Sequence, residues 1–153
     1  MRESSRKLGN AECEEIARKA FTEIASRFPN LSMTEDQGKP VEISITIPVQ
    51  PGLRQKVWLC LQNKDELHFG VGHLWLEWFP CSNPSKVQRY VESVSGYLSD
   101  LYRVIEYYRG PKCVRATLEA PTRNGWKTVG SYSRVFWSLT PGKKSIIELR
   151  NSI

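Results

Sequence analysis

The sequence predicts a single α+β domain over residues 1–153, with a frayed terminus at residues 1–9, in which two amphipathic helices pack on one face of a largely antiparallel, meandering sheet. About seven to nine strands are expected. The chain is 153 residues long and is 40% hydrophobic and 25% charged, which is typical of one globular core. Two segments carry apolar residues at helical spacing. The other apolar segments are short, alternate with polar residues and are separated by turn residues, as in strands joined by hairpins.

The two helices are predicted from apolar spacing and from their start signals. The first runs from Asn10, a suitable N-cap, to Phe28, with apolar side chains at steps of three and four residues. The second begins where Asn83 is followed by Pro84, because proline at the first helical position loses no needed N–H group. Its apolar stripe continues to Leu98.

About four strands are predicted between the helices. Residues 41–47 alternate Val and Ile with polar residues, and residues 56–62 are mostly apolar, so that each segment fits a strand. Residues 66–79 are also rich in apolar residues that fit a strand, but Gly70 and Gly72 interrupt this pattern. We therefore expect a tight turn or a bulge at these glycines.

Residues 101–109, beyond the second helix, fit either a strand or a continuation of that helix. The Tyr, Val and Ile residues of this segment favour a strand. Gly96, Ser99 and Asp100 are poor residues for a helix interior. The strand is the preferred interpretation, and the helical alternative stays open.

Two hairpins are predicted near the carboxyl end. Asn124 and Gly125 form the best short hairpin signal of the chain. Residues 134–139 are expected to pair with residues 145–151 across a turn that contains Pro141.

The two halves of the chain have a similar predicted layout. Residues 10–80 and residues 83–151 each hold one helix followed by about four strands. This layout is compatible with two α-β4 repeats, although few residues are identical.

Composition and cysteine spacing restrict the class of protein. No segment reaches the roughly 18 consecutive apolar residues of a membrane span, and the polar first ten residues do not resemble a secretory signal. The cysteines are far apart and form no CxxC pair, so they match no zinc or redox motif; they are Cys13, Cys60, Cys81 and Cys113. We expect a cytoplasmic protein with buried, reduced thiols, no membrane contact and no cofactor.

Charge is distributed unevenly along the chain. Residues 1–80 have a net charge of −1, residues 81–153 have a net charge of +7, and all six tyrosines lie in the second half. Tyrosine and arginine are enriched in binding surfaces. We therefore predict a binding surface in the second half, formed by Arg103, Arg109, Lys112, Arg115, Tyr102, Tyr108 and Trp126.

The segment HFGVGHLWLEWFPC (residues 68–81) holds both histidines. If Gly70 and Val71 form a hairpin turn, His68 and His73 lie side by side with Glu66 nearby, and these groups could bind a divalent metal or transfer a proton. If the strand continues straight, the two rings point to opposite faces and no site exists. His68, His73 and Glu66 are thus the candidate metal ligands, while a purely structural role for them is preferred.

The sequence contains none of the common catalytic signatures, such as GxSxG, a Walker loop, GxGxxG or HExxH. Glu106 lies among apolar residues and is expected to face solvent rather than to act as a base. The preferred hypothesis is a non-enzymatic binding protein that engages an acidic protein partner. The alternatives are a protein that binds single-stranded nucleic acid and a small metal-dependent enzyme centred on His68 and His73. A homo-oligomer is also compatible with the many aromatic residues, because an apolar sheet edge or face tends to pair with a copy of itself.

Overall fold

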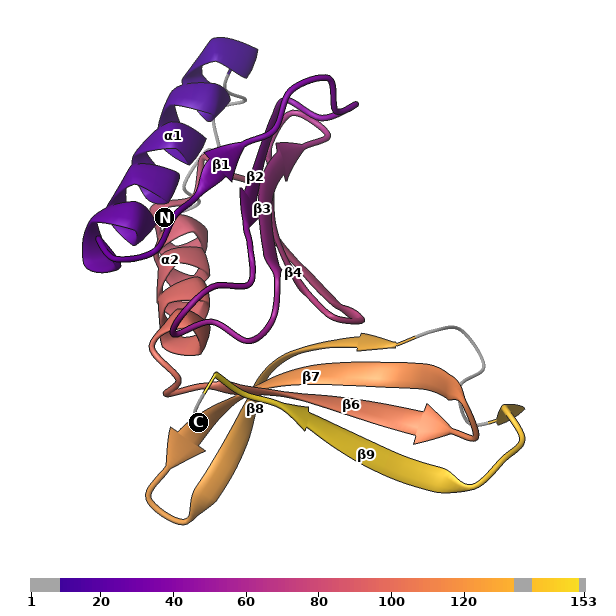
Figure 1. Cartoon of the computed structure of the whole chain (residues 1–153). Helices are drawn as coiled ribbons and strands as arrows, with labels where there is room; N and C mark the ends of the chain where they lie inside the picture. Colours follow the sequence, from indigo (N-terminus) through magenta and orange to yellow (C-terminus); the bar gives the residue numbers. More distant parts are fainter. Residues whose placement is uncertain (1–8, 134–138, 152–153) are drawn as a thin grey trace.

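The computed structural model describes residues 9–133 and 139–151, and Figure 1 shows the arrangement of their two helices and nine strands. The helices are α1 (Asn10–Arg27) and α2 (Pro84–Leu98). The strands are β1 (Thr34–Glu35), β2 (Ile43–Ile47), β3 (Val57–Gln62), β4 (Glu66–Val71), β5 (Leu74–Trp78), β6 (Arg103–Arg109), β7 (Lys112–Thr122), β8 (Gly125–Ser133) and β9 (Lys144–Leu149). All pairing between these strands is antiparallel. The predicted α+β class is confirmed.

Strands β1 to β5 form sheet 1 in the order β1-β2-β3-β4-β5, and both helices cover one of its faces (Figure 1). Every second residue of these strands points to the helices, and side chains such as Ile43, Leu59 and Phe69 are buried there. The buried hydroxyl of Tyr90 on α2 donates a 2.8 Å hydrogen bond to the carbonyl oxygen of His68 on β4. The main core therefore lies between the helices and sheet 1.

Strands β6 to β9 form a second sheet, sheet 2, in the order β8-β7-β6-β9. Strand β9 returns to pair with β6, and no other strand of the described residues pairs with its outer edge. The strands thus divide into two sheets, where the sequence pattern suggested one meander. The strand orders also differ between the two halves of the chain, because sheet 1 is a simple meander and sheet 2 is not.

The two sheets meet at the turn between β4 and β5 and along the edges of β5 and β8. In Figure 1, sheet 1 stands upright and sheet 2 lies across its lower end. Gly130 on β8 lies against Leu76 on β5, where an added Cβ would be 2.9 Å from the Leu76 Cδ1 atom. We call the face of sheet 2 that is turned toward sheet 1 the near face, and the opposite face the far face.

Most local predictions within the described residues are confirmed. Helix α2 is capped by Asn83, whose side chain accepts a 3.0 Å hydrogen bond from the backbone N–H of Ser85. Helix α1 is capped by Gly9 rather than by Asn10, which is already helical. Strand β6 confirms the strand interpretation of residues 101–109, and β7 and β8 form the predicted hairpin.

Some predictions fall outside the described residues. These are nearly all of the frayed segment, residues 1–8, and most of the strand expected over residues 134–139. Within the described ranges, neither helix is both long and apolar enough to cross a membrane. All four cysteines are buried, as expected, and none forms a disulfide.

Candidate functional site

The two histidines do not share a site. The turn between β4 and β5 consists of Gly72 and His73, so it lies two residues later than the turn at Gly70 that would have paired the two rings. His68 therefore faces Glu77 on β5, while His73 is at the tip of the hairpin. The condition for a side-by-side pair, a turn at Gly70 and Val71, is therefore not met, because Gly72, with a φ of +56°, provides the left-handed turn residue.

His68 is buried on the face of sheet 1 that points away from the helices. Its side chain is 1% exposed, and its Nε2 atom lies 3.0 Å from Glu66 Oε2 and 3.8 Å from Glu77 Oε2. The ring of Trp75 lies 5.1 Å away, between centroids. Hydrogen bonds from Asn63 and from His68 lower the pKa of Glu66 despite its partial burial. Glu66 is therefore ionised at neutral pH and accepts the hydrogen bond from His68.

This arrangement is typical of a buried, hydrogen-bonded histidine rather than of a metal ligand. With Nε2–H donating to Glu66, Nδ1 is buried and has no hydrogen-bond partner in the described part of the chain. A metal on Nε2 would move the proton to Nδ1, whereas ligating histidines normally donate that proton to an acceptor. Cys60, directly opposite His68, is not a nucleophile, because burial raises the pKa of its thiol to about 12.

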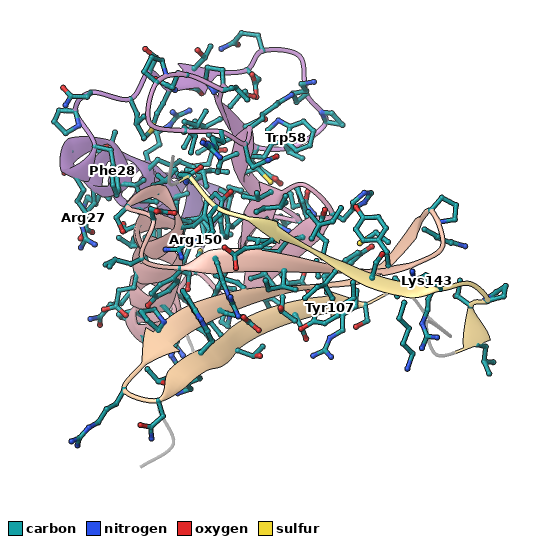
Figure 2. All side chains as sticks on the ribbon, turned by 60° about the horizontal axis from the view of Figure 1, so that its bottom comes forward. Arg27, Phe28, Trp58, Tyr107, Lys143 and Arg150 are labelled. Carbon is teal, nitrogen blue, oxygen red and sulfur yellow. The ribbon has the colours of Figure 1, made fainter. Side chains whose placement is uncertain are left out.

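Basic side chains of the second half gather at one end of the far face of sheet 2. Residues directly opposite each other on neighbouring strands share a face. Arg109 pairs with Lys112 on β7 and with Lys144 on β9, and Tyr107 pairs with Arg115. The Arg115 guanidinium lies over the Tyr107 ring, 5.5 Å from its centroid. We call this cluster the basic patch; it consists of Tyr107, Arg109, Lys112, Arg115, Lys144 and Ile146. Figure 2 turns this face toward the viewer, with Tyr107 labelled.

The basic patch keeps its positive charge. Within residues 9–133 and 139–151, none of its four cations forms an ion pair. Three of them, Arg109, Lys112 and Arg115, were predicted as binding residues. Tyr107, Lys144 and Ile146 were not predicted, and the two β9 residues were missed because no local pattern in the sequence shows that β9 pairs with β6.

The other end of the far face is neutralised by ion pairs. Arg103 donates 2.8 Å hydrogen bonds to both Glu119 and Glu148, and its guanidinium lies 4.1 Å from the centre of a Trp126 ring. Arg150 lies over the same indole at 5.4 Å. Arg103 and Trp126 therefore lie on the far face. The charge of Arg103 is already paired with two carboxylates, and the Trp126 ring is already stacked against two guanidinium groups.

The two predicted tyrosines lie away from the far face. Tyr102 packs against α2 at Gly96, where an added Cβ would be 2.6 Å from the tyrosine ring. Tyr108 lies on the near face and donates a 3.0 Å hydrogen bond to Glu106. Glu106 is itself only 4% exposed, so the expectation that it faces solvent is wrong.

Comparison with known proteins finds no family model, no curated protein and no solved structure that this chain matches. The arrangement of its side chains is therefore the basis for assigning a function.

Proposed function

We propose that the protein is a non-enzymatic binding protein whose basic patch engages an acidic segment of a partner protein. The observation that carries this proposal is the group of four cations that lie on one face of sheet 2 and form no ion pair within the described residues. Arg109 and Arg115 can each bind a carboxylate through two parallel N–H groups. Tyr107 and Ile146, which is 66% exposed, add contact area between the charges.

The spacing of the cations fits a short extended segment. Lys112, Arg109 and Lys144 form a row across three neighbouring strands. Such a row spans roughly 10 Å, because strands lie about 4.8 Å apart. Three or four residues of extended peptide cover this length, so two or three carboxylates of one segment can contact the row.

A protein partner is favoured over single-stranded nucleic acid, because guanidinium groups already stack on Tyr107 and Trp126 of the far face. Arg115 lies over Tyr107, and both Arg103 and Arg150 lie over Trp126. Nucleic-acid platforms stack bases on open ring faces. A guanidinium that is stacked on a ring still presents its N–H edge to a carboxylate, so the same geometry suits acidic side chains.

The proposal can be tested with two probes of equal net charge, a glutamate-rich peptide and a single-stranded oligonucleotide. Fluorescence anisotropy should show tighter binding of the peptide at every salt concentration. The double substitution Arg109→Ala/Arg115→Ala removes two contacts of about 1 kcal/mol each, so the peptide affinity should fall about tenfold or more. The control Lys86→Ala/Arg89→Ala removes the same charge from α2 and should change the affinity less than about twofold.

Two outcomes would contradict the proposal. Equal losses in the two double variants would show that only net charge matters and that the patch has no special role. Tighter binding of the oligonucleotide, with an affinity that falls steeply as salt rises, would replace the acidic protein by a nucleic acid.

A further inference from the structure

The point where sheet 1 meets sheet 2 contains a buried carboxylate that has no cationic partner among the described residues. Glu106 on β6 is 4% exposed and forms no ion pair with any Lys, Arg or His in the described part of the chain. Its Oε1 atom accepts a 3.0 Å hydrogen bond from the hydroxyl of Tyr108, and its Oε2 atom accepts a 2.7 Å bond from the backbone N–H of His73. A buried negative charge that has only neutral hydrogen-bond donors normally has a cation nearby.

The hairpin between β4 and β5 is shaped to fit against this carboxylate. A Cβ on Gly72 would be 2.8 Å from Glu106 Oε2, so the close approach requires glycine. The next residue, His73, has an exposed side chain whose ring lies edge-on to that of Tyr108, with the centroids 6.2 Å apart. The imidazole is thus held near the carboxylate but can still rotate.

A thiol completes the cluster from a third strand segment. Cys113 on β7 is the cross-strand partner of Tyr108, and a bulge next to this pair places it on the near face with Glu106. One ligand atom each from Cys113, Glu106 and His73 can be chosen so that all three lie within 4.8 Å of one another. Sulfur, nitrogen and carboxylate oxygen are the ligand types that zinc uses in proteins.

We propose that Cys113, His73 and Glu106 bind a zinc ion that joins the hairpin of sheet 1 to sheet 2. Binding replaces the thiol proton of Cys113, which passes to solvent, and the thiolate and carboxylate together balance the two charges of the ion. The fourth position is open to water on the exposed side of His73.

The geometry needs only a small adjustment for a tetrahedral ion. Ligand atoms at about 2.0 to 2.3 Å from zinc are roughly 3.3 to 3.7 Å apart. Because the present ligand atoms lie within 4.8 Å of one another, each distance must shorten by at most about 1.5 Å. Rotation of the exposed His73 side chain can shorten its own distances to Glu106 and Cys113. The hydrogen bonds from Tyr108 and from the His73 N–H orient the two carboxylate oxygens, as the outer-shell donors of metal sites do.

The test uses the full-length protein after treatment with a chelator, with cobalt(II) as a coloured substitute for zinc. One cobalt per chain should bind and give the near-ultraviolet charge-transfer absorption of a cobalt–thiolate bond. Zinc should then displace the cobalt. His73→Ala and Cys113→Ser should each weaken zinc binding by more than about 100-fold, and Tyr108→Phe, which removes an outer-shell donor, by about 10- to 100-fold.

Matched controls come from the buried His68 cluster. Cys60→Ser and Glu66→Gln should leave the absorption and the zinc affinity unchanged. Because His73 is exposed, His73→Ala tests the site even if Cys113→Ser does not fold. The proposal is overturned if cobalt binds without a thiolate band, if the band survives Cys113→Ser, or if His73→Ala binds zinc as tightly as the wild type.

Discussion

Replacing Gly72 by alanine should destabilise the protein by roughly 2.5 to 5 kcal/mol. The left-handed φ of +56° at this position costs an alanine about 1 to 2 kcal/mol. The new Cβ would also be 2.8 Å from Glu106 Oε2 and 2.8 Å from Leu149 Cδ1. Glu106 must then move and weaken its 2.7 Å hydrogen bond from His73, and a hydrogen bond to a charged group contributes about 1.5 to 3 kcal/mol.

Gly110 is the matched control for this substitution. It also has a φ of +56°, and it also occupies the first position of a two-residue hairpin turn, between β6 and β7. The nearest atom to an added Cβ is the Cα of Gly142, at 3.9 Å, which is an ordinary contact. Gly110→Ala should therefore cost only the backbone energy of about 1 to 2 kcal/mol.

Urea denaturation, followed by tryptophan fluorescence and by circular dichroism, measures both variants against the wild type. Coincident curves from the two probes establish two-state unfolding. The free energy of unfolding of Gly72→Ala should lie about 1.5 to 3 kcal/mol below that of Gly110→Ala. Equal losses in the two variants would refute the conclusion that the hairpin tip presses against Glu106.

Three further predictions concern individual hydrogen bonds and ion pairs, and each is measured by urea denaturation. Tyr97→Phe should leave stability unchanged or raise it slightly, because its buried hydroxyl has no partner among the described residues, whereas Tyr90→Phe loses a 2.8 Å bond and should cost about 1 to 2 kcal/mol; equal effects would contradict this. Ser44→Ala should cost about 1 kcal/mol at neutral pH, because the Ser44 hydroxyl is the main cause that lowers the pKa of Asp36. A depressed pKa stabilises the fold above the unfolded value of about 4, so this deficit should shrink as the pH falls below 4, and a deficit that stays constant would exclude the carboxylate as its source. Arg103→Ala should cost about 1 to 3 kcal/mol, because it leaves a largely buried carboxylate unpaired, while alanine at either arginine of the basic patch should change stability by less than about 0.5 kcal/mol.

Local patterns in the sequence were sufficient for the helices and for most strands, but not for the turn between β4 and β5. Both Gly70 and Gly72 interrupt the strand pattern, and only one of them forms the turn. Gly70 is required by packing, because a Cβ there would be 2.7 Å from the ring of Trp75. Gly72 is required by its backbone conformation. The two reasons look identical in the sequence, so the histidine pairing could not be decided from it.

Long-range pairing explains the errors in the predicted sites. Arg109, Lys112 and Arg115 were predicted from the excess of basic residues in the second half of the chain. Alternation alone would place Lys112 and Arg115 on opposite faces, and only the bulge beside Tyr107 and Tyr108 brings them to the same face. Lys144 joins them only through the pairing of β9 with β6, which are more than 30 residues apart in sequence. A hairpin from the other sheet contacts Glu106, which is buried. No pattern within its own strand distinguishes it from a solvent-facing glutamate.

Strand β9 presents one side of its backbone without a strand neighbour in the described part of the chain, and its two adjacent isoleucines, Ile146 and Ile147, are both exposed. Edges of this kind recruit other molecules and nucleate fibrous aggregates unless charges interrupt them. Lys144 and Glu148 stand on either side of the isoleucine pair. The two charged side chains thus act as gatekeepers. We expect that without both charges this strand edge would pair with strands of other molecules and promote aggregation.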